Sequence, residues 1–173
     1  SPEQTSFIGS LLESYKRRSN FPDVADYEEL RSIQPKTTAD KKRHESDYFL
    51  IDRDTGHHYL IELKIGGDLD NKKARAEKEA LLEQFAILSN TISIDTPISI
   101  RFATAYNRYE EGQPWLQGRV RQYFADDELL IGKNFWNFVC GHDNGYQIVI
   151  DEYQRNASEI TTALETIKHT YLD

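Results

Sequence analysis

The chain has 173 residues, a length that suits one domain with a substantial core and is too short for two large ones. Hydrophobic residues make up 38% and charged residues 29%, as in ordinary folded proteins, and no apolar run approaches the roughly 18 residues of a membrane span. The net charge of −8 disfavours a protein that coats nucleic acid nonspecifically, although an acidic protein can still hold DNA in one basic groove. The single cysteine, Cys140, excludes an internal disulfide framework, and we expect a buried thiol in a cytoplasmic protein.

The first half of the chain alternates helical and strand patterns. Residues 6–18 are predicted to form an amphipathic helix, and the polar, proline-containing residues 22–46 a loop with a short helix. Two strands are expected at 47–53 and 58–64, joined by a turn at the sequence Asp-Thr-Gly. A long helix is predicted at 70–90, capped by Asp68 or Asp70. Its buried stripe is formed by Ala74, Leu81, Leu82, Phe85 and Leu88.

The second half predicts a further strand and several helices. Alternating apolar residues indicate a strand at 96–108, and residues 119–124 and 132–139 are predicted to be short helices packed by their aromatic side chains. Residues 146–153 are predicted to form a late strand. A closing helix is expected at 157–172, with an inward face of Ile160, Ala163, Leu164 and Ile167. The predicted fold class is therefore mixed α/β, a single domain over the whole chain with a central sheet flanked by helices.

The second predicted strand carries two charged residues among apolar ones. Because side chains alternate along a strand, Glu62 and Lys64 share a face with Leu60. Antiparallel pairing around the predicted turn sets Asp47 and Lys64 at similar distances from that turn. We therefore expect Asp47, Glu62 and Lys64 to converge at one edge of the sheet.

This trio favours a particular chemistry. Two carboxylates a few ångström apart repel one another, so each is protonated or neutralised by a cation. Mg²⁺ suits such a site because it is a hard ion that is usually held by one or two carboxylates together with water and substrate phosphate. A neighbouring lysine would offset the negative charge of an attacking hydroxide or of the transition state. Together these groups predict hydrolysis of a phosphodiester bond by a metal-bound water.

The order of these residues resembles the core of the PD-(D/E)XK nucleases: Asp47, then a Glu-Leu-Lys segment on the next strand, then a long helix. The residue before Asp47 is Ser46, where that pattern often has proline. The wider stretch HESDYFLIDRDTGHHYLIELKIGGDLDNKKARAEKEALLEQFAIL and the later IGKNFWNFV resemble type II restriction endonucleases of the TdeIII group. The resemblance covers the chain from residue 8 to the region of residue 150.

The resemblance implies a Mg²⁺-dependent endonuclease, with Mn²⁺ as a substitute ion, that cuts both strands of a short site in double-stranded DNA. Such an enzyme would act as a homodimer, with no membrane partner, and restrict foreign DNA in the cytoplasm of a bacterium. By position, Asp47 and Glu62 would hold the metal ion, and Lys64 would position or activate the attacking water. Glu13, on the first helix, would be an additional metal ligand.

Basic and amide side chains mark the predicted DNA-binding residues. The beginning of the long helix combines the positive end of the helix dipole with basic side chains, and both favour phosphate. At and after the third strand, arginine and asparagine could pair bidentately with guanine and adenine edges. The candidates for DNA contact are Asn71, Lys72, Lys73, Arg75, Arg101, Asn107 and Arg108.

Plain structural explanations are open for each of these residues. A Glu-x-Lys segment is often a solvated strand face, Asp47 could simply begin a strand, and Glu13 could be a surface acid. The functional alternatives are a repair or structure-specific nuclease with the same core, and a catalytically inactive relative that binds DNA or a protein. A self-repelling acid pair gives a binding protein no advantage, so the nuclease interpretation is preferred.

Overall fold

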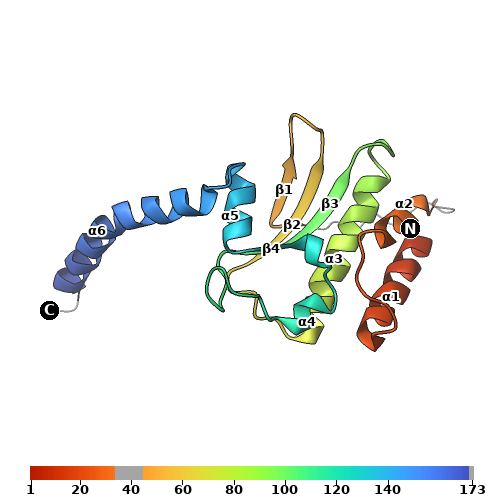
Figure 1. Cartoon of the computed structure of the whole chain (residues 1–173), viewed down its shortest axis with the longest axis horizontal. Helices are drawn as coiled ribbons and strands as arrows, with labels where there is room; N and C mark the ends of the chain where they lie inside the picture. The colour runs from red at the N-terminus through yellow and green to blue at the C-terminus, as the bar shows by residue number, and fades with distance from the viewer. Residues whose placement is uncertain (34–44, 172–173) are drawn as a thin grey trace.

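The computed structural model describes residues 1–33 and 45–171, which form one sheet with helices around it (Figure 1). In chain order the elements are α1 (Pro2–Arg17), α2 (Asp26–Ser32), β1 (Tyr48–Ile51), β2 (His58–Lys64), α3 (Asn71–Ser89), β3 (Ile98–Thr104), α4 (Gly118–Arg121), the 3₁₀ helix η1 (Asp126–Glu128), β4 (Leu129–Ile131), α5 (Lys133–Cys140) and α6 (Gly145–Tyr171). The predicted class, a mixed α/β fold with a central sheet flanked by helices, is confirmed.

The sheet has four strands in the order β1-β2-β3-β4. β1 pairs antiparallel with β2, whereas β2, β3 and β4 run parallel to one another. The last residues of the parallel strands, Lys64, Thr104 and Ile131, lie side by side, and we call this side of the sheet the carboxyl edge. Because β1 runs the other way, the residues that precede it reach the same edge. Ligands of open α/β sheets bind outside such an edge.

Helices cover both faces of the sheet. α3 packs on one face with α1 against it, and Leu12 and Phe102 are fully buried in this larger core. α5 packs on the other face, where Phe135 meets Ile61 in a smaller core. Because side chains alternate along β2, its even-numbered residues face α1 and α3 and its odd-numbered residues face α5.

α3 forms where its apolar stripe predicts a helix. Ala74 and Leu81 are fully buried against the sheet side of the molecule. Asp70, one of the two predicted caps, accepts a hydrogen bond from the backbone N–H of Lys73 at 2.8 Å. Asp68, the other, lies in the loop before the helix. The cap satisfies one of the unpaired N–H groups at the helix beginning.

One charged side chain lies inside the buried stripe of α3, and the sequence pattern does not predict it. Lys78 has no exposed surface, and its Nζ donates to both carboxylate oxygens of Glu128, at 2.6 and 2.7 Å, and to the Tyr27 hydroxyl. Burial lowers the pKa of Lys78 well below its ordinary value and raises the pKa of Glu128 well above its own. Each group would be unfavourable if buried alone, so their contact ties α2, α3 and η1 together.

The predicted strand at 146–153 is wrong, because these residues begin α6, and the fourth strand is β4 instead. A short alternating pattern fits one face of a helix as well, and apolar spacings of three and four continue to residue 171. The predicted inward face of the closing helix is also wrong. Ile160, Leu164 and Ile167 are 46%, 62% and 51% exposed, and Ala163 is exposed too. The cause is visible in Figure 1, where α6 leads away from the sheet.

Cys140, expected to be buried, is a free and exposed thiol at the end of α5. α5 turns Phe135 toward the sheet, so its last residue falls outside the smaller core. In the parts of the chain that the structure describes, no helix combines the length and the apolar character that a membrane crossing requires.

Gly67 lies in the loop that leads from β2 into α3, with a φ of 63°. A Cβ at this position would lie 2.6 Å from Thr104 Cγ2 and 2.9 Å from the Trp115 ring. We expect Gly67→Ala to lower the free energy of unfolding by about 1–3 kcal/mol, because it strains the backbone and crowds the end of β3. Urea denaturation measures the loss against Gly118→Ala, whose Cβ would meet nothing within 4 Å. Equal stability of the two variants would contradict the prediction.

Candidate active site

The two charged residues near the end of β2 lie at the carboxyl edge and face α3. Lys64 Nζ contacts Glu62 Oε1 and lies 3.0 Å from Glu77 Oε1 of α3. The Glu62 side chain is 11% exposed, compared with 30% for Lys64 and 24% for Glu77. The three groups are therefore sheltered, yet still accessible from solvent.

Asp47 reaches the same place from the residue before β1. Its Oδ2 accepts a hydrogen bond from the backbone N–H of Leu63, at 2.9 Å. Asp47, Glu62 and Lys64 are thus brought together at one edge, as the sequence predicts. The register of β1 and β2 sets Asp47 beside Glu62, so the expected pairing of Asp47 with Lys64 is wrong by two residues.

The turn between β1 and β2 explains this shift in register. The backbone carbonyl of Asp52 accepts a hydrogen bond from Gly56 N–H at 2.9 Å. The Asp52 side-chain oxygen Oδ1 accepts hydrogen bonds from the N–H groups of Asp54 and Thr55, at 2.8 and 3.2 Å. These bonds centre the turn one residue earlier than the Asp-Thr-Gly pattern suggests. Moving the centre of a hairpin by one residue moves each strand partner by two.

The cluster carries more negative than positive charge. Burial raises the pKa of Glu62; the hydrogen bond from Lys64 lowers it, and the negative charges of Glu77 and Asp47 raise it again. Burial alone would lower the pKa of Lys64, but its hydrogen bonds to Glu62 and Glu77 outweigh burial and raise it. The carboxylates outnumber the ammonium group, so a cation would be attracted to this place.

Glu77 is the member of the cluster that the sequence analysis missed. It follows buried Ala74 by three residues and precedes buried Leu81 by four, which sets it beside the stripe that faces the sheet. The helix pattern alone therefore contained a signal for Glu77. Glu77 was nevertheless not selected as a site residue, because a run of charged residues near the beginning of a helix is usually a solvated face.

We expect Glu77→Gln to lower the pKa of Glu62 in the metal-free protein. Burial is the largest cause of the raised Glu62 pKa, and the charge of Glu77 raises it further, so the substitution removes one of these influences. Glu62 would then stay ionised to a lower pH than in the wild type. NMR titration of the side-chain carboxyl carbons measures the shift, with Glu79→Gln on the same helix as the control. A Glu62 pKa that is unchanged or higher would contradict the prediction.

Glu13, the predicted additional ligand, lies on α1 among basic side chains. It contacts Arg17 at 3.0 Å and lies 3.8 Å from Lys16 and from Arg75 of α3. The hydrogen bond from Arg17 is the main reason that its pKa is lowered. These contacts join α1 to the first turns of α3, and a role for Glu13 as a metal ligand stays a prediction.

The predicted phosphate contacts gather at the beginning of α3. Asn71, Lys72 and Lys73 are exposed there, and Arg75 is half-buried beside Glu13. The helix begins at the carboxyl edge, after the short loop from Lys64. A phosphate bound to its first turn would therefore lie next to the carboxylate cluster.

The predicted base contacts are distributed differently. Arg108 is exposed and pairs with Asp68 at 2.6 Å, in the loops that border the carboxyl edge. Asn107 is buried, and its side chain donates to the Gln113 carbonyl at 2.7 Å, so it serves the loop itself. Arg101 lies on the opposite face of the sheet from Glu62, packed over the Tyr59 ring. The structure therefore brings Arg108 near the site and does not bring Arg101 there.

The oxygen donors at the carboxyl edge suit a divalent cation. Within residues 1–33 and 45–171, no three His, Cys, Asp or Glu side chains form a complete metal cluster. Mg²⁺ does not require one, because it is usually held by one or two carboxylates, water and phosphate. Asp47, just before β1, and Glu62 of β2 offer hard oxygen donors side by side, next to the negative charge of Glu77. These residues fit a hard cation such as Mg²⁺.

Comparison with protein-family models identifies the class of the protein. A model described as "Type II restriction endonuclease, HinfI" matches residues 1–157. The chain belongs to the HinfI family of type II restriction endonucleases, a class of endodeoxyribonucleases that bind DNA. The predicted class is thereby confirmed, and the likeness to the TdeIII group stays a prediction. Searches of curated proteins and of solved structures found no match.

Proposed function

We propose that this protein is a Mg²⁺-dependent endonuclease of the PD-(D/E)XK type that cuts double-stranded DNA at a short specific site. The observation that carries the proposal is the placement of Asp47, Glu62 and Lys64 together at the carboxyl edge of the sheet. Membership of the HinfI family supports it. Mn²⁺ would substitute for Mg²⁺, because the same oxygen donors suit both ions. The TdeIII-like motifs fit the same chemistry.

Each residue of the cluster has a role that its chemistry allows. Asp47 and Glu62 would provide oxygen ligands, and the Leu63 N–H holds the Asp47 carboxylate in place. A bound Mg²⁺ supplies an acidified water and positive charge beside the phosphate. Lys64 would orient the attacking water and offset the negative charge that develops on the phosphate. Glu77, which already contacts Lys64, would hold the ammonium in position.

The first turn of α3 would bind the DNA backbone next to this cluster. Its exposed Lys72 and Lys73, together with Asn71 and the free N–H groups of the helix, would contact phosphate. Arg75 would add positive charge, and Arg108 would reach the bases from the neighbouring loop. We retain Arg101 and Asn107 as base contacts, and Glu13 as a further ligand, only as sequence-based predictions.

The chain would act as one nuclease domain in the cytoplasm and as a homodimer. A dimer suits a palindromic site, because two-fold related active sites can cut both strands. The alternative functions are a repair or structure-specific nuclease, and an inactive binding relative. Family membership favours restriction over both.

Digestion of a supercoiled plasmid with Mg²⁺, alongside a sample with EDTA, tests the proposal. Discrete fragments that form only with Mg²⁺ are the expected result, and the sequences of their ends would reveal the recognition site. A smear would retain the chemistry but reject site-specific restriction. Intact plasmid under all metal and salt conditions, with folding confirmed, would favour the inactive binding relative.

A further inference from the structure

α6 carries an uninterrupted heptad pattern that the nuclease proposal does not use. Apolar residues recur along this helix at alternating spacings of four and three, from residue 146 to residue 171. This is the spacing that keeps one stripe of a helix facing a partner helix in a coiled coil. In heptad notation the a positions are Ile150, Ala157, Leu164 and Tyr171.

The d positions complete the stripe, which we call the α6 seam together with the a positions above. They are Tyr146, Tyr153, Ile160 and Ile167. The 27-residue helix is about 40 Å long, and the seam runs for about three and a half heptads. A pattern of at least three to four heptads is what indicates a coiled coil.

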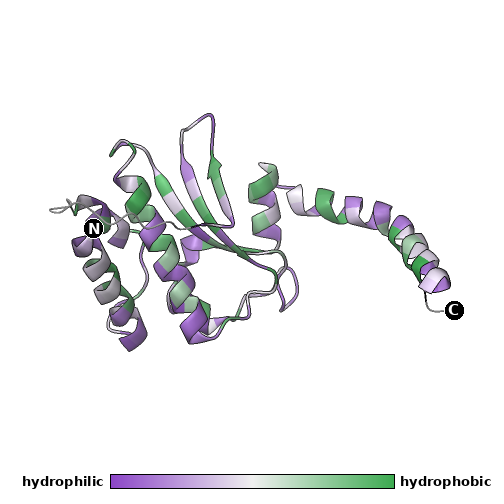
Figure 2. Cartoon of the chain, turned by 180° about the vertical axis from the view of Figure 1, so that it is seen from behind, coloured by the Kyte–Doolittle hydropathy of each residue, from purple (hydrophilic) through white to green (hydrophobic). Residues whose placement is uncertain are grey.

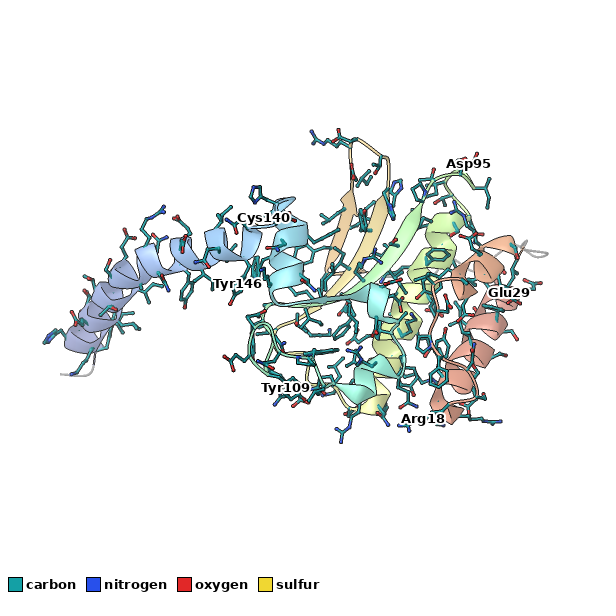
Figure 3. All side chains as sticks on the ribbon, in the orientation of Figure 1. Arg18, Glu29, Asp95, Tyr109, Cys140 and Tyr146 are labelled. Atoms are coloured by element: carbon teal, nitrogen blue, oxygen red, sulfur yellow. The ribbon has the colours of Figure 1, made fainter. Side chains whose placement is uncertain are left out.

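Most of the α6 seam has no cover in the described part of the chain. From residue 151 to residue 171 every residue except Asn156 is exposed. Figure 2 shows hydrophobic positions spaced along α6, and Figure 3 shows its side chains projecting into solvent away from the sheet. A helix in water draws most of its stability from packing an apolar face, so this seam is expected to have a partner.

The charges of α6 indicate which partner fits. The charged residues of its middle part occupy outer positions of the heptad, away from the seam: Asp151, Glu152, Arg155, Glu159 and Glu165. The e and g positions that flank the seam are uncharged, except for Lys168. Charges at these positions normally select one partner and repel others. Because the flanking positions of α6 carry almost no charge, nothing there repels an identical helix or selects a different one. A second copy of α6 therefore fits.

We propose that α6 forms a two-helix coiled coil with α6 of a second copy of this chain. Within each copy, the packing of α6 against α5 would fix the position of the sheet relative to the coiled coil. A Cβ on Gly145 would lie 2.6 Å from the Trp136 carbonyl oxygen, so the two helices approach closely there. The Asn137 side chain also accepts a hydrogen bond from Tyr146 N–H at 2.9 Å. The coiled coil would therefore set the spacing of two nuclease sites, although the pairing itself does not depend on nuclease activity.

Sedimentation equilibrium of the full chain tests this inference. Wild type is expected to have twice the 20.1 kDa chain mass. The seam variant Ile160→Glu, Leu164→Glu is expected to have the single mass, because it places charges inside the paired helices. The matched control Thr162→Glu, Thr166→Glu adds the same charges at the same spacing on the outer side. It should remain a dimer.

A wild type with the mass of one chain would overturn the inference, and so would a seam variant that keeps the doubled mass. Circular dichroism of both variants would show whether α6 remains helical, and a control that dissociates like the seam variant would also count against a specific seam. The measurement is of mass, so it separates the two proposals. A dimer that does not cut DNA would reject the nuclease function alone, and a monomeric nuclease would reject the coiled coil alone.

Discussion

Lys64→Ala is expected to slow DNA cleavage by about 10²–10³-fold at saturating Mg²⁺, the usual effect of removing a group that stabilises transition-state charge. The ammonium group lies between Glu62 and Glu77 at the carboxyl edge, where the scissile phosphate would be bound. Its removal withdraws positive charge from the place where negative charge develops. The fold should persist, because the Lys64 side chain is partly exposed and belongs to neither core.

The initial rate at which supercoiled plasmid disappears measures this effect. Arg53→Ala is the matched control, because it removes one positive charge from the exposed turn at the other end of the same hairpin. The control is expected to cut at the wild-type rate. If Lys64→Ala also cut at that rate, the assignment of the active site to the end of β2 would be wrong.

Glu128→Ala is expected to lower the free energy of unfolding by about 3–5 kcal/mol, as is usual when one partner of a buried ion pair is removed. Lys78 would keep its position with no exposed surface and lose both carboxylate oxygens that now contact it. The Tyr27 hydroxyl would lose a partner as well. A typical domain is stable by about 5–15 kcal/mol, so the midpoint of urea denaturation should fall strongly.

Replacing the whole buried group tests the cause of this loss. The triple variant Tyr27→Phe, Lys78→Met, Glu128→Leu leaves no unpaired polar side-chain atom in these three residues, and buried ion pairs are often replaced by apolar residues without loss of stability. Both this variant and Glu128→Ala lose the hydrogen bond that Ala125 N–H donates to Glu128, so that loss cancels in the comparison. It should be much more stable than Glu128→Ala. A Glu128→Ala variant no less stable than Glu159→Ala, on the exposed outer side of α6, would show that the buried pair contributes little.

The hairpin and the helix of the site follow from local patterns in the sequence. Strand alternation sets Glu62 and Lys64 on one face, and the apolar stripe predicts that α3 is a helix with one buried side. The position of Asp47 is harder to predict from the sequence, because the strand register depends on where the turn closes. The hydrogen bonds of Asp52 closed it one residue earlier than the turn pattern predicts.

Other features depend on contacts between distant segments. Lys78 looks like a surface lysine in sequence, and only Glu128, fifty residues later, makes its burial possible. Residues 146–153 fit a strand and a helix equally well, and the choice depends on whether a neighbouring strand is available. The exposure of Leu164 could not be inferred either, because periodicity shows that a helix has an apolar face but not what covers it.

Binding of Mn²⁺ to the metal-free protein, followed by the electron paramagnetic resonance signal of the free ion, tests the central claim that Asp47 and Glu62 hold a divalent cation. Wild type should take up Mn²⁺, and Glu62→Gln should bind it much more weakly. Lys64→Ala should bind it at least as tightly as wild type, because Lys64 occupies oxygens of Glu62 and Glu77. No uptake by the wild type, or equal uptake by wild type and Glu62→Gln, would contradict the account.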